Sequence, residues 1–273
     1  MLKISAILSL TFLFSVHVIV ASWGLATFLT LTLALFWALP HSQSDYTFRL
    51  EINKQLIGSM FYFSLGNHVA RLLWLAPFML FPIIVANTLG PEMNAYFFIP
   101  WIIAQTLFGL PLAVSYSLFS EGSANEYSLR ANISKSLKLC LLILFPSIVL
   151  LSLFRNQLLL LFGVDYYESS SALLFILVAS VIPVAINQIG LSVMRVRENI
   201  GWVLIVSALS ACLTLVSGYL LMIRIGITGI GIAWISTQTL VGLIVGIYLF
   251  FTRDQLSIHE TPSESFLPGI KRS

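Results

Sequence analysis

Charged residues are scarce in this sequence, and acidic residues are missing from its apolar stretches altogether. Asp, Glu, Lys and Arg make up 9% of the 273 residues, whereas about a quarter is usual in a soluble domain. Hydrophobic residues make up 58%, and the mean hydropathy is +0.96. This composition excludes an ordinary soluble globular domain and indicates a multi-pass membrane protein.

Features that suggest catalysis are also missing. The two cysteines, Cys140 and Cys212, lie in apolar runs and are interpreted as packing residues rather than a disulfide. The sequence has no Walker phosphate loop, no metal-ligand cluster and no carboxylate pair within an apolar run, and its polar loops are too short for a catalytic domain. We therefore expect a protein that is not an enzyme and has no cofactor, no metal site and no nucleic-acid partner.

Eight apolar runs are each near the roughly 20 residues that cross a bilayer as a helix. They are residues 4–20, 23–39, 60–86, 95–119, 137–154, 172–193, 202–223 and 226–251. The first run is interpreted as a spanning helix, with a signal peptide as the weaker alternative, and the first two runs also suit a re-entrant hairpin. The sequence thus predicts an all-α polytopic membrane protein with about eight transmembrane helices.

Basic residues are distributed unevenly between the two predicted sides of the membrane. With strict alternation of the eight runs, eleven Lys and Arg residues, Arg195 among them, fall on one side and only Arg155 and Arg224 on the other. Because loops on the cytoplasmic side are enriched in Lys and Arg, the separation predicts that both termini are cytoplasmic. Arg71 is left inside the membrane.

Arg71 shares one face of its predicted helix with three polar residues. Ser64, Asn67 and His68 lie on this face because the spacings are three and four residues. A guanidinium near the middle of a bilayer costs about 2.5 kcal/mol or more, and no carboxylate within the apolar runs is available to neutralise it. The pattern predicts a hydrated path that attracts an anion, with Arg71 as the main binding group. The alternative is that Arg71 extends to the headgroup region, since it lies only about three turns from the start of its run.

Other polar residues within the apolar runs are amides. Gln105 is a further candidate for the lining of the path, whereas Asn187, Gln188 and Gln238 are interpreted first as partners in hydrogen bonds between helices. The candidate substrate-binding residues are therefore Arg71, Asn67, His68, Ser64 and Gln105.

Three stretches of the sequence resemble polysaccharide flippases of the multidrug/oligosaccharidyl-lipid/polysaccharide exporter (MOP) superfamily. Residues 81–90 (FPIIVANTLG) with 95–97 (AYF) resemble the first helix and loop of a lobe in these proteins. Residues 110–123 (LPLAVSYSLFSEGS) are similar to the helix that follows, and residues 226–234 (GITGIGIAW) to the last helix of a lobe. The resemblance covers roughly residues 58–251, and its motifs are soft patterns.

The resemblance implies a definite domain organisation. Residues 60–251 would form a C-terminal lobe of six helices, and residues 1–39 the last two helices of an incomplete N-terminal lobe. Residues 40–59 would be a cytoplasmic linker between the lobes, and residues 252–273 a polar, disordered tail. Since the family has two six-helix lobes, the chain would lack about four leading helices, so we expect a missing N-terminal half or a second chain as partner.

The function that the resemblance implies is the flipping of polyprenyl-pyrophosphate-linked oligosaccharides across the inner membrane by alternating access. Such a protein would serve the biosynthesis of O-antigen or capsule, and its partners would be the lipid-linked oligosaccharide and membrane lipids. One alternative is a cation-coupled multidrug antiporter of the same superfamily, for which acidic rather than basic cavity groups are expected. A second is a truncated fragment that does not transport.

Overall fold

The computed structural model describes residues 16–38, 41, 54–124 and 129–251, which form helices joined by short turns. The chain divides into two compact units, Met1–Ile57 and Gly58–Ser273. In the first unit, α2 (Val16–Leu33) continues into a short π-helix, η1 (Ala34–Ala38). Most of the expected helix at 4–20, most of the expected linker and all of the expected tail lie outside the described residues.

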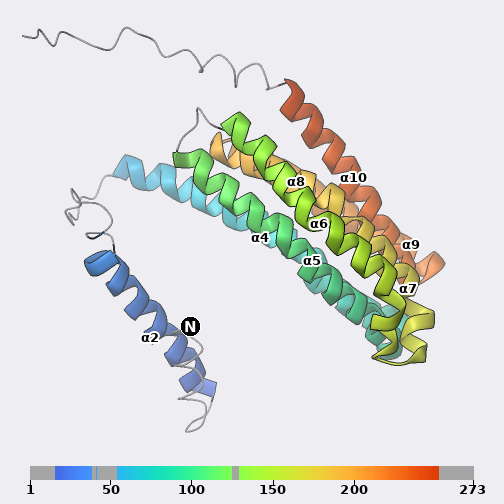
Figure 1. Cartoon of the computed structure of the whole chain (residues 1–273). Helices are drawn as coiled ribbons and strands as arrows, with labels where there is room; N and C mark the ends of the chain where they lie inside the picture. The colour runs from blue at the N-terminus through green and yellow to red at the C-terminus, as the bar shows by residue number, and fades with distance from the viewer. Residues whose placement is uncertain (1–15, 39–40, 42–53, 125–128, 252–273) are drawn as a thin grey trace, which may run out of the picture. The chain divides into compact units, whose positions relative to one another are not determined.

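Among the described residues, seven helices lie wholly or mostly in the second unit (Figure 1). Their bounds are α4 (Lys54–Leu89), α5 (Pro91–Ala124), α6 (Leu129–Leu160), α7 (Val164–Ala179), α8 (Val181–Val196), α9 (Ile200–Ile225) and α10 (Ile227–Phe251). Together with the first unit, the described residues hold seven helical segments long and apolar enough to cross a membrane. The expected all-α polytopic membrane protein is thereby confirmed, and its last six predicted spans each coincide with an observed one.

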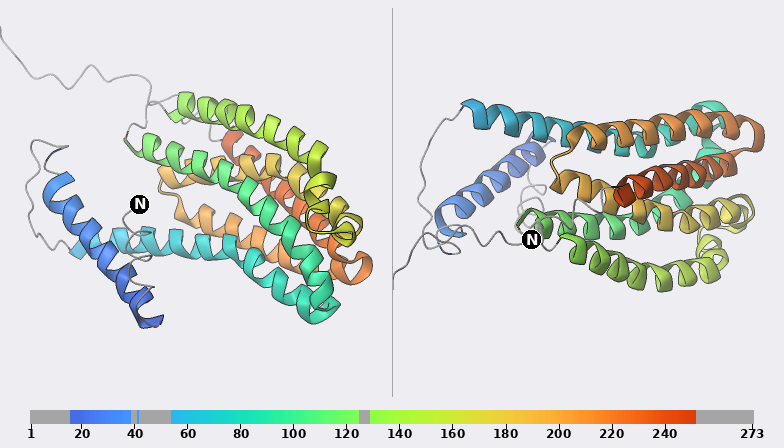
Figure 2. Two further views of the ribbon diagram at one scale, coloured as in Figure 1. Left: turned by 60° about the horizontal axis from the view of Figure 1, so that its bottom comes forward. Right: turned by 90° about the horizontal axis from the view of Figure 1, so that it is seen from above.

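Three turns at one end of the second unit depend on glycine. Gly90, Gly163 and Gly226 join α4 to α5, α6 to α7 and α9 to α10, and all three have positive φ, at 95°, 132° and 69°. Residues with a Cβ rarely adopt such angles, so glycine allows each helix to follow the previous one after one to three residues. We call this the glycine-turn end; the two further views show the helices of the unit extending away from it (Figure 2).

The span predicted at 172–193 is divided into two helices. α7 ends at Ala179 and α8 begins at Val181. Between them the buried Ser180 donates a hydrogen bond from Oγ to the carbonyl of Leu177 at 2.6 Å, and Pro183, which has no N–H to donate, follows in the first turn of α8. α8 begins directly after this interruption, and its residues from Asn187 to Met194 are all buried.

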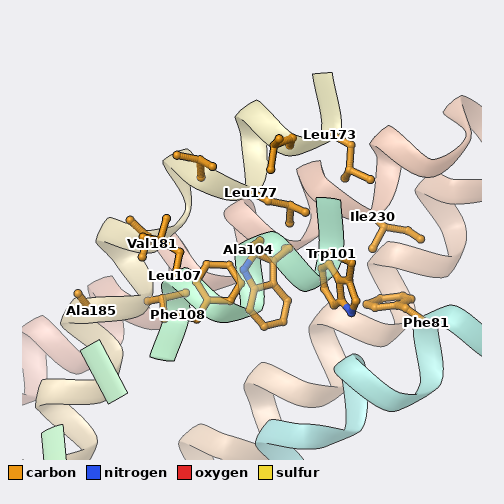
Figure 3. Close-up of a cluster of buried hydrophobic side chains, with 14 of the residues drawn as sticks. Phe81, Trp101, Ala104, Leu107, Phe108, Leu173, Leu177, Val181, Ala185 and Ile230 are labelled. Atoms are coloured by element: carbon orange, nitrogen blue, oxygen red, sulfur yellow. The ribbon is translucent and has the colours of Figure 1, made fainter. Parts of the chain in front are cut away.

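Aromatic side chains fill the centre of the second unit. Trp101 and Trp234 are almost wholly buried, and their rings meet at 5.4 Å in an edge-on arrangement. Phe81 of α4 lies edge-on to Trp101 at 5.8 Å (Figure 3), and its other side meets Gly218 of α9, where a Cβ would lie 2.5 Å from the ring. Aromatic pairs of this kind add about 0.5–1.5 kcal/mol each to the burial of their area. We call this set the aromatic cluster; it also includes Trp74, Phe78, Phe97 and Phe108.

Candidate functional site

A groove runs along α4, α5 and α8 as three adjoining cavities that share Arg195. The middle cavity has a volume of about 430 Å³. The inner one, about 40 Å³, leads toward the middle of the helices, and the outer one, about 310 Å³, leads to the end opposite the glycine turns. The middle cavity is lined by Phe63, Ser64, Asn67, His68, Arg71, Tyr116, Phe119 and Arg195. We call the three together the arginine groove.

Arg71 lies where the inner and middle cavities meet, because it lines both. Its side chain is exposed and makes no hydrogen bond or ion pair with any residue that the structure describes. The helical wheel that predicted one polar face of α4 is reproduced: Ser64, Asn67 and His68 line the same middle cavity as Arg71. A guanidinium with all its donors available is thus presented to the groove.

Arg195 is the second cation of the groove, in the last turn of α8. Its Nε donates a hydrogen bond to Asn67 Oδ1 at 3.1 Å. The Asn67 amide is itself oriented, since its Nδ2 donates to the carbonyl of Phe63 one turn earlier in α4 at 3.0 Å. The Nη1 of Arg195 is buried and has no hydrogen-bond partner in the described part of the chain. The groove therefore holds one oriented and one free guanidinium.

The charge of the groove has one sign along most of its length. Neither the inner nor the middle cavity has an acidic residue in its lining. Glu198 lines only the outer cavity, in the turn between α8 and α9, where its φ of 54° marks a tight reversal of the chain. Two guanidinium groups without a carboxylate between them, in a groove with low-dielectric walls, produce a positive potential that concentrates anions.

Beyond the two arginines, the lining of the inner cavity is uncharged and includes several hydrogen-bonding groups. Asn187 Nδ2 donates to both the carbonyl and Oε1 of Gln238, at 2.9 and 2.7 Å, and Gln238 Nε2 donates to Ser210 Oγ at 3.2 Å. These bonds link α8, α10 and α9, which confirms the expected role of Asn187 and Gln238 between helices. Asn187 Oδ1 is buried without a partner in the described structure, so the closed end of the groove retains a free acceptor.

The α5 and α8 helices are held together beside the groove by two serines. Ser115 Oγ donates to the carbonyl of Gln188, and Ser192 Oγ donates to the carbonyl of Ser115, both at 2.8 Å. All three residues are buried. This reciprocal pair fixes the register of α8 against α5 and hence the height at which Arg195 enters the groove.

Gln105 is the one candidate that the structure does not bring to the groove. It is half-buried on α5 and absent from the linings of all three cavities. It shares a helical face with Leu112, which lines the inner cavity, but lies seven residues, or about 10 Å, further along the helix. At that depth α5 contributes Trp101 and Phe108 to the aromatic cluster.

Arg195 is the functional candidate that the sequence did not reveal. The charge pattern placed it among the loop residues of the basic side, just beyond the predicted span at 172–193. The structure instead continues α8 to Val196, so that Arg195 is still helical and turned toward α4. The signal that could have found it is the polar series Gln188, Ser192 and Arg195, whose spacings of four and three residues place them on one helical face.

The fold has counterparts among solved structures. An outward-facing multidrug resistance MATE family transporter of the MOP superfamily superimposes with a TM-score of 0.77 over 94% of this chain, at 16% identity. The chain shares the fold of this transporter. A MATE transporter in complex with MaL6 gives a TM-score of 0.71 over 89% of the chain at 14% identity. A MOP-superfamily transporter from Pyrococcus furiosus, described as having a binding pocket of reverse polarity that suggests a different function, gives 0.57 over 74% at 20% identity.

This chain spans only part of the length of these MOP-superfamily transporters, namely 61%, 56% and 46% of the three. These structural neighbours are transporters, not enzymes. No protein-family model and no curated protein sequence matches the chain.

Proposed function

We propose that this chain takes part in the translocation of a polyprenyl-pyrophosphate-linked oligosaccharide across the inner membrane, with both of its termini in the cytoplasm. The observation that carries the proposal is the pair of guanidinium groups, Arg71 and Arg195, in a groove whose inner and middle cavities have no carboxylate in their lining. A pyrophosphate bears adjacent negative charges, and guanidinium binds phosphate oxygens through two parallel N–H···O bonds.

The hydrogen bonding of the two arginines suits such an anion. Among the described residues, none accepts a hydrogen bond from Arg71, and none accepts one from the buried Nη1 of Arg195. Leaving a buried donor unsatisfied costs about 1–3 kcal/mol, and more for a charged group. A phosphate oxygen at this point would remove that cost. This gain in hydrogen bonding favours the binding of the pyrophosphate headgroup between the two arginines.

The remaining parts of the substrate have separate surroundings. Ser64, His68 and Tyr116 line the middle cavity and offer hydrogen bonds to sugar hydroxyls, while the polyprenyl chain stays in the lipid. The groove is open at the end opposite the glycine turns and ends at the aromatic cluster. A transporter that works by alternating access is open to only one side of the membrane at a time, and this groove suits such a state. The other wall of the path would come from an N-terminal lobe, either in a longer form of the protein or in a second chain.

A cation-coupled multidrug antiporter is the second candidate, and the similarity to a multidrug resistance MATE transporter favours it. A cationic drug is repelled by groups of like charge, however, and the inner and middle cavities present Arg71 and Arg195 with no acidic residue in their lining. The transporter from Pyrococcus furiosus is a precedent for a change of pocket polarity within this fold. If the chain is instead a fragment that does not transport, neither the lipid-linked anion nor a cationic drug should bind specifically.

Binding to the purified full chain distinguishes these candidates. The probes are a fluorescent polyprenyl pyrophosphate, the matching uncharged polyprenol, and ethidium as a cationic drug. We expect the pyrophosphate to bind at least about tenfold more tightly than the polyprenol and the R71A/R195A double variant to lose this difference. Equal binding of pyrophosphate and polyprenol, or ethidium as the preferred ligand, would refute the proposal.

A further inference from the structure

A third arginine, Arg155 of α6, lies near the glycine-turn end, well outside the arginine groove. Its Nε donates to Asn156 Oδ1 at 3.3 Å and to Ser171 Oγ of α7 at 3.2 Å, and its Cζ lies 4.7 Å from the centre of the Phe175 ring. Neither Nη group has a partner in the described structure, and no acidic residue there pairs with the side chain. The guanidinium is thus held in one orientation with its outer edge free.

The surface around Arg155 is apolar and suited to lipid. Phe175 of α7 is 46% exposed, and Ile182 and Ile186 of α8 are also exposed. Because they follow Phe175 at spacings of seven and four residues, the three side chains form a stripe along α7 and α8. At 100° per residue, this stripe is on the opposite side of α8 from the groove residues Gln188 and Arg195. The stripe therefore faces away from the groove, where acyl chains would lie against the helices.

The depth of Arg155 matches a phospholipid headgroup. It lies five residues before the end of α6 at Leu160, which corresponds to about 8 Å. Exposed apolar residues, Phe154 and Leu161, flank it on both sides along the chain. A guanidinium at this level, one to two turns inside the end of a spanning helix, is at the boundary where lipid phosphates are found.

Glu168 supplies a group of opposite charge further out. It is exposed on α7 three residues before Ser171 and seven before Phe175, hence on the same helical face and one turn nearer the membrane surface than Ser171. It does not form an ion pair with Arg155, because no nitrogen of Arg155 lies within 4.0 Å of a carboxylate oxygen of Glu168. A cation deeper and an anion further out match a headgroup whose phosphate lies beneath an ammonium group.

We propose that the α6–α7 surface is a binding site for a zwitterionic aminophospholipid. The free Nη edge of Arg155 binds the phosphate, Glu168 binds the primary ammonium, and the Phe175–Ile182–Ile186 stripe accommodates an acyl chain. Ser171 and Asn156 position the guanidinium. The site is independent of the proposed transport, because none of these residues lines the arginine groove.

Native mass spectrometry of the full chain, released from detergent with defined lipids, tests the site. The probes are phosphatidylethanolamine, phosphatidylglycerol and phosphatidylcholine at equal concentration. We expect one phosphatidylethanolamine to be retained preferentially, and R155A to weaken its retention by about tenfold. Arg224 is the matched control, since it is an exposed arginine near the same end, and R224A is expected to change nothing.

Two further arms keep the proposal falsifiable. E168Q should bring phosphatidylethanolamine and phosphatidylglycerol to within about twofold of each other while R155A lowers both, and a photoreactive phosphatidylethanolamine should label peptides of α6 and α7. R155Q replaces R155A if the alanine variant does not fold. Equal retention of the three lipids, equal losses in R155A and R224A, or labelling confined to other helices would each overturn the proposal.

Discussion

Arg195 and Asn67 are 128 positions apart in the sequence and are joined by a hydrogen bond of 3.1 Å from Nε to Oδ1. The bond connects the last turn of α8 to the polar face of α4 and is the contact that brings the second cation to the first. The Asn67 amide is held by the Phe63 carbonyl at the same time, which orients its oxygen toward Arg195. The position of the groove's second cation therefore depends on one neutral side chain.

Replacing Asn67 should weaken the groove without removing either charge. In N67A, Arg195 loses its acceptor, and hydrogen bonds to charged groups are worth about 1.5–3 kcal/mol. We expect polyprenyl pyrophosphate to bind at least about fivefold more weakly and the melting temperature in detergent to fall. S64A is the control, since Ser64 lines the same cavity and makes no hydrogen bond in the described structure. If both variants behave alike, Asn67 has no positioning role.

Charge reversal at Arg71 should invert the ligand preference. R71E places a carboxylate in the middle cavity, so we expect binding of the anionic probe to disappear and binding of ethidium to appear. The measurement is fluorescence titration of both probes. Q105E introduces the same charge on α5, beyond the closed end of the groove, and is expected to leave both affinities within about twofold of wild type. A comparable inversion by Q105E would mean that the path extends past the aromatic cluster.

The contact of Phe81 with Gly218 predicts a large effect from a single methyl group. In G218A the new Cβ would lie within 2.5–2.8 Å of two ring carbons of Phe81, and such overpacking typically costs about 1–3 kcal/mol. The fully buried Phe81 has no room to move within the aromatic cluster. We expect a clear loss of thermal stability, measured by melting of the purified protein in detergent.

G246A is the matched control for this substitution. Gly246 also lies inside a helix, α10, but a Cβ there would meet nothing within 4 Å. Alanine in place of an unstrained helical glycine stabilises by about 0.5–1 kcal/mol. A melting temperature that falls as much in G246A as in G218A would show that the α4–α9 contact is not the cause.

The sequence predicted most accurately what depends on local chemistry. The apolar run predicted at 226–251 includes the whole of α10. Arg71 shares a cavity with Ser64, Asn67 and His68, because helical spacing alone places the four residues on one face. The break at Ser180 was not predicted, since Pro183 is one of several prolines in these helices and most of the others lie inside unbroken ones.

Tertiary packing determined what the sequence did not reveal. Arg195 enters the groove only because Ser115 and Ser192 fix α8 against α5 and Asn67 meets it from α4. Gln105 was a reasonable candidate as a polar residue in an apolar run, but its depth relative to the aromatic cluster depends on how α4, α5 and α10 pack. Neither relationship is contained in any one helix.

The central claim is that a hydrated, positively charged groove surrounds Arg71, and charge-selective labelling of position 68 measures it directly. H68C is introduced into a chain with Cys140 and Cys212 replaced by alanine, and is treated with thiosulfonate reagents of negative and positive charge from both faces of the membrane. L72C, on an exposed apolar position of α4 outside the groove linings, is the control. We expect H68C to be labelled rapidly, and the anionic reagent to react at least about tenfold faster than the cationic one. R71A should remove this preference for the anionic reagent. Labelling of H68C as slow as that of L72C, or with no preference for the anion, would contradict it.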